Sequence, residues 1–194
     1  MRTLILGGVR SGKSRLAERL AVETGRQVVY VATATAGDDE IARRIEAHRR
    51  HRPPDWIVVE EPLAIARALA DLARSGRCLV VDCLTLWLTN LLIHSDPALL
   101  ETERVALLEA VPKLAGDLIL VGNETNMGII PVGEVSRRYC DEVGLLHQAL
   151  AARCDRVVLT VAGLPLLLKG PSLDIPFRTS GREGGDTPRE PNDR

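Results

Sequence analysis

Gly7-Gly8-Val9-Arg10-Ser11-Gly12-Lys13-Ser14 matches GxxxxGK(S/T), the pattern of a phosphate-binding loop, or P-loop. The motif directly follows a short apolar run and precedes a segment of helical period, which is the context it requires. Its glycines let backbone N–H groups approach phosphate oxygens, and the following helix N-terminus adds a favourable dipole. We therefore expect Lys13 to reach the β and γ phosphates and the Ser14 hydroxyl to bind Mg²⁺. A glycine-rich turn that binds nothing is the alternative, which this context disfavours.

Outward from the P-loop, short β-branched runs alternate with segments of helical period, which is typical of strand–helix units around a mainly parallel sheet. The expected strands, with boundaries good to about two to four residues, are 3–6, 27–31, 56–60, 78–82, 118–121 and 156–161. The expected helices are 13–24, 38–50, 63–74, 84–94, 98–114 and 132–153. The sequence thus predicts an α/β fold.

Length and composition indicate one soluble globular domain. The chain has 194 residues, of which 45% are hydrophobic and 26% charged, so disordered, collagen-like and coiled-coil classes are disfavoured. We expect a P-loop domain over residues 1–169. The segment 170–194 is rich in Gly, Pro and charge and has few apolar residues to bury, so we expect a flexible C-terminal tail there.

Charge and cysteine content bear on partners and location. The net charge of −1 creates no overall attraction to nucleic acid or membranes, and 3% aromatic residues offer little base stacking. Neither the N-terminus nor the run 78–93 fits a secretory signal or a membrane span. The four cysteines form no CxxC pair and no zinc-ligand cluster. We therefore expect a reduced, cytoplasmic protein without bound nucleic acid.

Asp82 is the candidate for the second acidic group that a P-loop enzyme needs near its metal. It ends the apolar run 78–82. A role as the cap of a helix that begins near Leu84 is an alternative and is compatible with metal binding. The guanine-reading NKxD pattern of switch GTPases is absent, since the nearest segment is Asn123-Glu124-Thr125-Asn126. A switch GTPase is therefore disfavoured.

The segment 43–53 is strongly basic, and helical spacing places Arg44, His48 and His51 or Arg52 on one face. Composition alone favours a solvated helix surface. The alternative is a phosphate clamp in which a neutral histidine attacks a nucleotide α-phosphate and neighbouring arginines stabilise the developing charge.

A further polar loop follows the strand expected at 118–121. Because α/β proteins build their sites at the carboxyl ends of strands, Asn123 and Glu124 are candidates to meet substrate or metal. A plain turn explains them equally well.

Five segments together resemble the bifunctional adenosylcobinamide kinase/adenosylcobinamide-phosphate guanylyltransferase family of cobalamin biosynthesis. They are LILGGVRSGKSRLAE (4–18), YVATATAGDDEIARRIEAHRRHRPPDW (30–56), VVDCLTLWLTNLL (80–92), VGNETNMGIIP (121–131) and VAGLPLLLKG (161–170). The resemblance spans almost all of residues 3–169. It implies a RecA-like P-loop fold and a homotrimer with the nucleotide site near a subunit boundary.

The same resemblance implies two reactions. In the first, ATP or GTP phosphorylates the aminopropanol hydroxyl of adenosylcobinamide. In the second, GMP passes from GTP to that phosphate through a guanylylated histidine, which releases pyrophosphate and yields adenosylcobinamide-GDP. Mg²⁺ is the implied cofactor.

Site residues follow from the resemblance position by position. His48 lies four residues before the Arg52-Pro53 pair and corresponds to the guanylylated histidine, so His48 and Lys13 are the implied catalytic residues. The implied metal ligands are Ser14 and Asp82. The implied nucleotide-binding residues are Gly7, Gly8, Val9, Arg10, Ser11, Gly12, Lys13, Ser14, Ala32, Thr33, Ala34, Arg49, Arg50, His51, Arg52, Glu60 and Asp82.

The sequence departs from the family pattern at a few positions. Val9 replaces a more usual Ala, Thr125-Asn126 stands where Val-Gly is common, and His147 occupies a position often filled by Asn. Two other functions compete with the bifunctional enzyme. One is a P-loop kinase without guanylyl transfer, and the other is a non-catalytic nucleotide-binding or RecA-type nucleic-acid protein.

Overall fold

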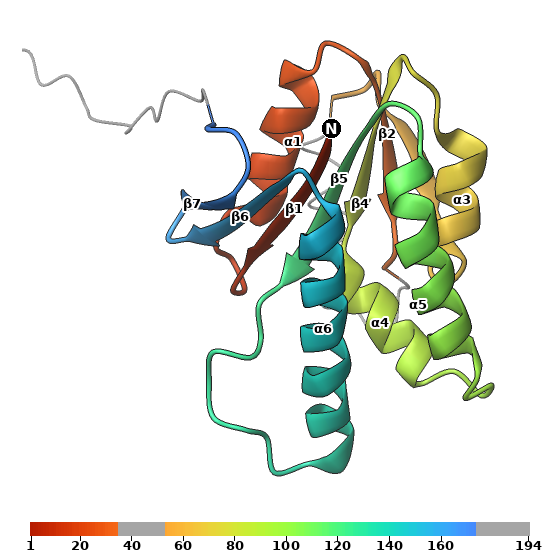
Figure 1. The fold of residues 1–194 in the computed structure, drawn as a ribbon, viewed down its shortest axis with the longest axis vertical. Coiled ribbons are helices and arrows are strands. Elements are labelled where there is room, and N and C mark those ends of the chain that lie inside the picture. The colour runs from red at the N-terminus through yellow and green to blue at the C-terminus, as the bar shows by residue number, and fades with distance from the viewer. Residues whose placement is uncertain (35–52, 174–194) are drawn as a thin grey trace, which may run out of the picture.

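A seven-stranded sheet forms the centre of the computed structural model, which describes residues 1–34 and 53–173 (Figure 1). The strand order is β3-β2-β4-β5-β1-β6-β7, and every neighbouring pair is parallel except the antiparallel pair β6–β7. The strands are β1 (Arg2–Gly7), β2 (Gln27–Ala32), β3 (Ile57–Glu60), β4 (Arg77–Asp82), β5 (Asp117–Asn123), β6 (Arg156–Val161) and β7 (Leu164–Lys169).

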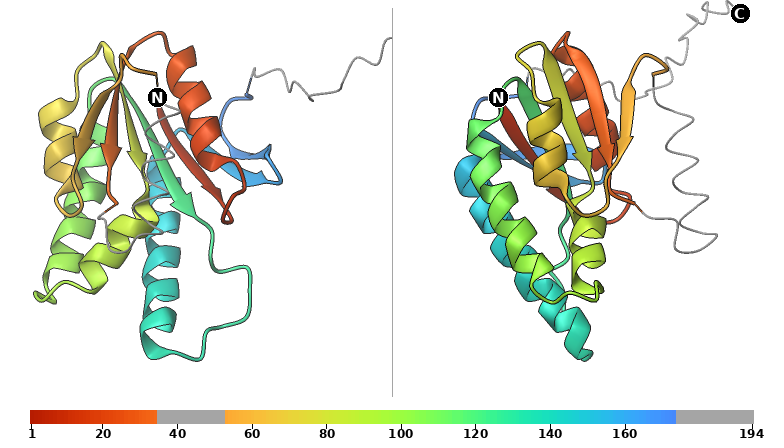
Figure 2. Two further views of the ribbon diagram at one scale, coloured as in Figure 1. Left: turned by 180° about the vertical axis from the view of Figure 1, so that it is seen from behind. Right: turned by 90° about the vertical axis from the view of Figure 1, so that its right-hand side faces the viewer.

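Helices cover both faces of this sheet (Figure 2). They are α1 (Lys13–Glu23), α3 (Ile65–Leu72), α4 (Leu84–Leu92), α5 (Leu99–Ala110), a short 3-10 helix η1 (Val111–Lys113) and α6 (Glu134–Arg153). Helix α1 packs on one face, where Leu16 and Leu20 share a buried cluster with Ile5. Helices α3 to α6 pack on the other face, in the cluster that contains Leu4 and Leu6.

Most of the apolar runs that predicted strands are buried on both faces, whereas the edge strand β3 is largely exposed. Successive side chains of a strand point to opposite faces, so a strand covered on both sides is apolar throughout. In β5, for example, the five residues Leu118 to Gly122 are all buried, and only the two ends are partly exposed. The predicted α/β class, with a mainly parallel sheet flanked by helices, is confirmed.

Two differences from the predicted elements stand out. The edge strand β7 was not predicted, because Pro165 interrupts its run and its residues are largely exposed. The helix expected at 98–114 divides into α5 and η1 at Pro112, since proline cannot donate the backbone hydrogen bond that continues an α-helix. The helix predicted at 38–50 and the segment 174–194 of the predicted tail lie outside the described residues.

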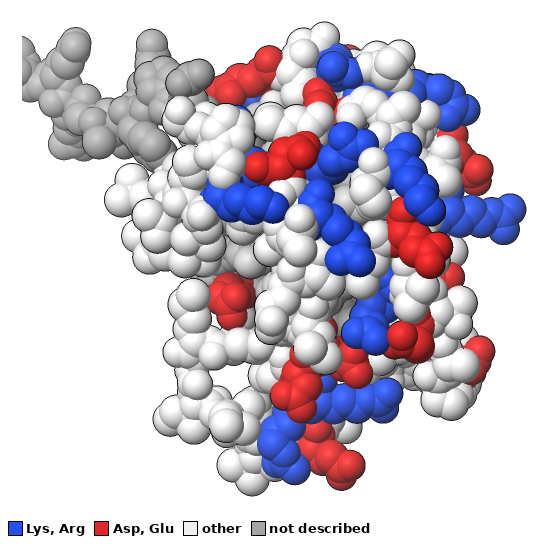
Figure 3. All heavy atoms as spheres, viewed as in Figure 1, with Lys and Arg blue, Asp and Glu red and all other residues white. Residues whose placement is uncertain are grey.

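Charged residues of both signs are interspersed over the face formed by α3, α5 and α6, whereas the loop that precedes α6 is largely uncharged there (Figure 3). Across residues 1–34 and 53–173, no helix is long and apolar enough to cross a membrane.

Candidate nucleotide-binding site

The candidate site lies at the carboxyl edge of the parallel strands. Strand β5 separates β1 from β4, and the register places Gly7 beside Asn123 and Asp82 beside Val121. Ala32 at the end of β2 pairs with both Asp82 and Glu60. Parallel strands thus bring the P-loop, Asp82 and the end of β2 to one edge, where α/β proteins bind their ligands.

The base of the P-loop is fixed by contacts with β6. The Thr160 hydroxyl donates to the Leu6 carbonyl oxygen at 3.0 Å and lies 2.8 Å from the Ser11 hydroxyl. Because the Thr160 proton is used on Leu6, Ser11 must be the donor in the second bond. A Cβ on Gly7 would lie 2.4 Å from both Thr160 oxygens, so only glycine fits there.

The turn between β6 and β7 supports the other side of the loop. The Gly163 N–H donates to the Ser11 carbonyl oxygen at 2.9 Å, and the Ser11 N–H donates to the Gly8 carbonyl oxygen at 3.2 Å. Gly12 adopts a φ of 97°, a left-handed conformation that glycine accepts readily, and α1 begins at the next residue. The arc from Gly8 to Arg10 is exposed. The loop is therefore held at its base and open toward solvent at its tip.

The Lys13 side chain is buried and extends across the P-loop to Gly8. Its Nζ donates to the Gly8 carbonyl oxygen at 2.7 Å. Burial lowers the pKa of Lys13, and the nearby Asp82 and then Cys83 oppose that effect. An ammonium group with few surrounding waters attracts a phosphate more strongly than one in bulk solvent. Lys13 is thus placed to stabilise anionic phosphate oxygens at the loop.

Asp82 is anchored from β2. The Tyr30 hydroxyl donates to Asp82 Oδ2 at 2.8 Å. Helix α4 begins after Cys83 without a side-chain cap, so Asp82 does not serve as its cap. Asp82 is thus a half-buried carboxylate beside the P-loop lysine. A carboxylate in this position suits binding of a metal ion near the nucleotide phosphates.

The segment after β2 is tied to the same strand end. Thr33 is fully buried, and its hydroxyl donates to the Cys83 carbonyl oxygen at 2.7 Å and accepts from the Cys83 N–H at 2.9 Å. The Asn90 side chain donates to the Thr33 carbonyl oxygen at 2.9 Å. These bonds hold residues 32–34 against the carboxyl end of β4, at the same edge of the sheet as Asp82.

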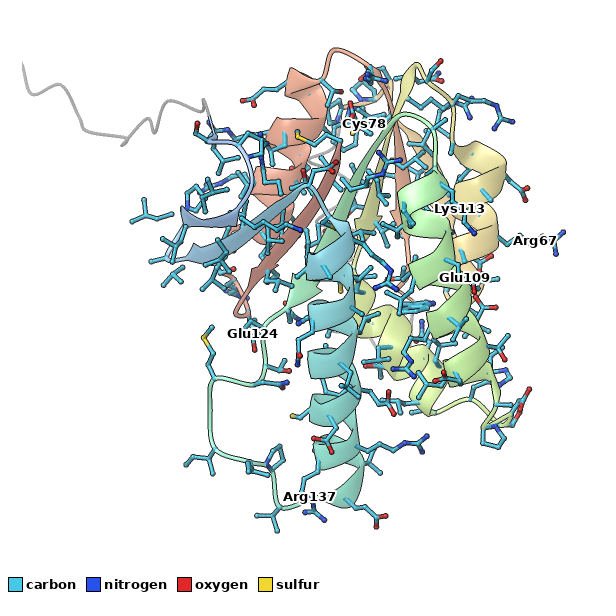
Figure 4. The ribbon with its side chains drawn as sticks, viewed as in Figure 1. Arg67, Cys78, Glu109, Lys113, Glu124 and Arg137 are labelled. Atoms are coloured by element: carbon cyan, nitrogen blue, oxygen red, sulfur yellow. The ribbon has the colours of Figure 1, made fainter. Side chains whose placement is uncertain are left out.

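Glu124 stands at the exit of β5, beside the P-loop (Figure 4). Its N–H donates to the Gly7 carbonyl oxygen at 2.9 Å, and its Oε1 accepts from the Asn126 N–H at 2.7 Å. Its Oε2 lies 3.9 Å from Nδ1 of His147 on α6. Burial lowers the pKa of His147, and Glu124 opposes that effect. The sequence did not distinguish a site role from a turn role for Glu124, and the structure places its backbone beside the start of the P-loop.

The chain matches a known protein family over most of its length. Residues 3–168 match the family described as cobinamide kinase / cobinamide phosphate guanyltransferase. The chain belongs to this family. The resemblance inferred from the sequence motifs is thereby confirmed, and so is the predicted class of enzyme.

Curated members of this family match over their full length. The bifunctional adenosylcobalamin biosynthesis protein CobP of Pseudomonas aeruginosa is 63% identical over 173 residues, which cover 89% of this chain and 100% of that protein. The bifunctional adenosylcobalamin biosynthesis protein CobU of Escherichia coli K12 is 35% identical over 182 residues, covering 87% and 100%.

Solved structures also resemble the chain. The RadB recombinase aligns with a TM-score of 0.47 and 17% identity, over 81% of this chain and 73% of that chain. The P4 protein of bacteriophage φ6 aligns with a TM-score of 0.47 and 12% identity, over 85% and 53%.

Within this member of the family, the predicted residues divide into two groups. The P-loop, residues 32–34 and Asp82 meet at one edge, with Glu60 exposed at the end of β3. His48, Arg49, Arg50, His51 and Arg52 lie outside the described residues. The supporting roles of Tyr30, Thr160 and His147 were not predicted, although Tyr30 and Thr160 each lie near the end of a predicted strand.

Proposed function

We propose that this member of the family uses one P-loop for both reactions: phosphorylation of adenosylcobinamide by ATP or GTP, and GMP transfer from GTP to adenosylcobinamide phosphate with release of pyrophosphate. The observation that carries the proposal is buried Lys13, which spans the P-loop next to Asp82. Both reactions begin with a bound nucleoside triphosphate, and a single phosphate site serves both.

For the kinase reaction, we assign the phosphate contacts to the P-loop. The exposed arc from Gly8 to Arg10 offers backbone N–H groups, and α1 directs its N-terminus toward the same place. Lys13 stabilises the negative charge that develops on the transferred phosphoryl group. The half-buried Ser14 and the Asp82 carboxylate fit Mg²⁺, which prefers oxygen ligands and retains several waters. When bound, Mg²⁺ neutralises charge on the β and γ oxygens.

For GMP transfer, we propose His48 as the nucleophile. Its imidazole nitrogen attacks the α-phosphorus of GTP, the bond to the β-phosphate oxygen breaks, and pyrophosphate leaves with the electron pair. Arg49, Arg50, His51 and Arg52 follow it in sequence and supply positive charge to the transition state. Ala32, Thr33, Ala34 and Glu60 line the remaining nucleotide site in this proposal. It rests on the sequence pattern and on membership of the family.

We further propose that the protein is a cytoplasmic homotrimer. Exposed apolar side chains support subunit association: Leu164, Leu166 and Leu168 on β7 are 60%, 56% and 56% exposed. Sedimentation equilibrium tests the assembly. A mass of one chain at micromolar concentration would contradict it.

A turnover assay tests the proposed function. Wild-type protein with Mg²⁺, ATP, GTP and adenosylcobinamide is expected to yield adenosylcobinamide-GDP and pyrophosphate, and adenosylcobinamide phosphate when GTP is left out. A well-folded Lys13→Ala protein is expected to form both products far more slowly. Phosphorylation without any GMP transfer would instead establish a simple P-loop kinase.

A further inference from the structure

We infer that Glu124 accepts the proton of the acceptor hydroxyl in the kinase reaction, and that His147 is a positioning residue that holds its carboxylate. The inference rests on the proposed function. It divides the two reactions of the enzyme between different residues, because only one of their acceptors carries a hydroxyl proton.

Glu124 lies between the P-loop and Asp82 at the end of β4. Strand β5 lies between β1, which leads into the P-loop, and β4, which ends at Asp82. The chain that leaves β5 therefore emerges between the P-loop and Asp82. The bond from the Glu124 N–H to the Gly7 carbonyl oxygen fixes its backbone at the start of the P-loop. An acceptor that approaches the terminal phosphate of a nucleotide in this loop therefore passes close to Glu124.

The Glu124 side chain is held from two sides. Its Oε1 accepts from the Asn126 N–H at 2.7 Å, and the Asn126 side chain donates to the Cys140 carbonyl oxygen on α6 at 2.8 Å. Its Oε2 faces His147 Nδ1 at 3.9 Å. The Glu124 side chain is nevertheless 17% exposed, so its carboxylate is fixed and still accessible to a substrate.

His147 is buried on α6 with one ring nitrogen toward Glu124. Its residue is 6% exposed, and among the described residues Nε2 is buried without a hydrogen-bond partner. A Cβ on Gly122 would lie 2.9 Å from Nε2, so the glycine in β5 makes room for the ring. With Nε2 buried and without a partner among the described residues and Nδ1 toward a carboxylate, the tautomer that carries its proton on Nδ1 is favoured. A buried nitrogen without a hydrogen bond destabilises the fold and calls for an explanation. The contact of the other ring nitrogen with Glu124 supplies one.

The chemistry of the two acceptors explains the division of roles. In the kinase reaction the acceptor oxygen forms a bond to the γ-phosphorus, the bond from that phosphorus to the β-phosphate oxygen breaks, and ADP or GDP leaves with the electron pair. The hydroxyl proton moves to Glu124. In GMP transfer the acceptor is a phosphate monoester, whose oxygens are already ionised near neutral pH. That acceptor has no proton to give up.

The test compares the two reactions in a Glu124→Gln protein. Glutamine keeps the shape and the Oε1 acceptor for Asn126 but removes the basic carboxylate. The kinase kcat is expected to fall about 100- to 10,000-fold, the usual contribution of a general base, with KM for ATP within about twofold of wild type. GMP transfer to preformed adenosylcobinamide phosphate is expected to stay near the wild-type rate. Glu109→Gln, an exposed change on α5, is the matched control and should alter neither reaction.

His147 variants test the positioning role. Asparagine places an amide near the position of Nδ1, whereas leucine fills the space without a polar group. His147→Leu is expected to lower the kinase kcat about tenfold or more, in the range typical of side chains that orient a reacting group, and His147→Asn should restore most of it. Equal kinase rates in the two variants would overturn the role assigned to His147.

Three results would overturn the role of Glu124. The first is a kinase rate unchanged in Glu124→Gln. The second is an equal loss of both reactions, since that would indicate nucleotide or metal binding rather than proton transfer. The third applies if Glu124→Gln does not fold, in which case a folded Glu124→Ala protein is assayed with added formate. Kinase activity that formate does not raise would contradict the inference, whereas rescue by formate supports it. A wild-type protein with no kinase activity would refute the proposed function and this inference with it.

Discussion

Replacing Thr160 by valine tests how β6 supports the P-loop. Thr160 is 1% exposed, and its hydroxyl bonds both the Leu6 carbonyl oxygen and the Ser11 hydroxyl. Valine has nearly the same volume, so the change removes these two bonds without opening a cavity. Each lost bond costs about 0.5–1.5 kcal/mol, and each partner left buried and unpaired adds to that cost, so we expect a loss of about 2–4 kcal/mol in the free energy of unfolding.

Urea unfolding followed by circular dichroism measures this loss, through the shift in midpoint at constant slope. Thr102→Val is the matched control, because Thr102 is exposed on α5 and its hydroxyl bonds the Ala98 carbonyl oxygen within the same helix. That change should cost less than about 0.5 kcal/mol. Thr160→Val should also weaken ATP binding, since Ser11 loses the bond that sets the loop. Equal stability of the two variants would refute the reasoning.

Three further predictions concern single residues. Lys13→Ala should slow both reactions about 100- to 1,000-fold by removing charge stabilisation at the phosphates, as initial rates with adenosylcobinamide and its phosphate will show. Gly7→Ala should lower the free energy of unfolding by about 3 kcal/mol in urea, because its Cβ would lie 2.4 Å from Thr160 oxygens. The folded pKa of His147 lies below its ordinary value of 6.5, so below that pH the unfolded chain binds more protons and stability falls. His147→Asn should therefore have a shallower loss of stability than wild type as the pH falls from 7 to 5 in urea titrations, by at most about 1.4 kcal/mol per pH unit.

The central strands and the P-loop were predictable from the sequence because their signals are local. Strands buried on both faces are apolar along their length, and Gly7 to Ser14 carry their pattern in consecutive residues. The edge strand β7 has neither signal, since its leucines are exposed and Pro165 interrupts it. Its pairing with β6 is a tertiary contact that a local pattern does not record.

The supports of the site were not predictable, because they join residues far apart in the chain. Ser11 meets Thr160 across 149 positions, and Tyr30 meets Asp82 across 52. The sequence could not distinguish a site role from a turn role for Glu124, for the same reason. Its place beside Gly7 depends on the insertion of β5 between β1 and β4, and strand order cannot be read from hydrophobic periodicity.

The most direct test of the proposed two-step function is a labelling experiment on His48. Wild-type protein and a folded His48→Ala protein are incubated with Mg²⁺ and GTP labelled at the α-phosphate, then denatured and assayed for bound label. A phosphoramidate to histidine is labile in acid and stable in alkali. The account predicts such a label on the wild-type chain and none on His48→Ala. Equal label on both chains, or none on an active wild-type enzyme, would contradict the guanylyl-histidine mechanism.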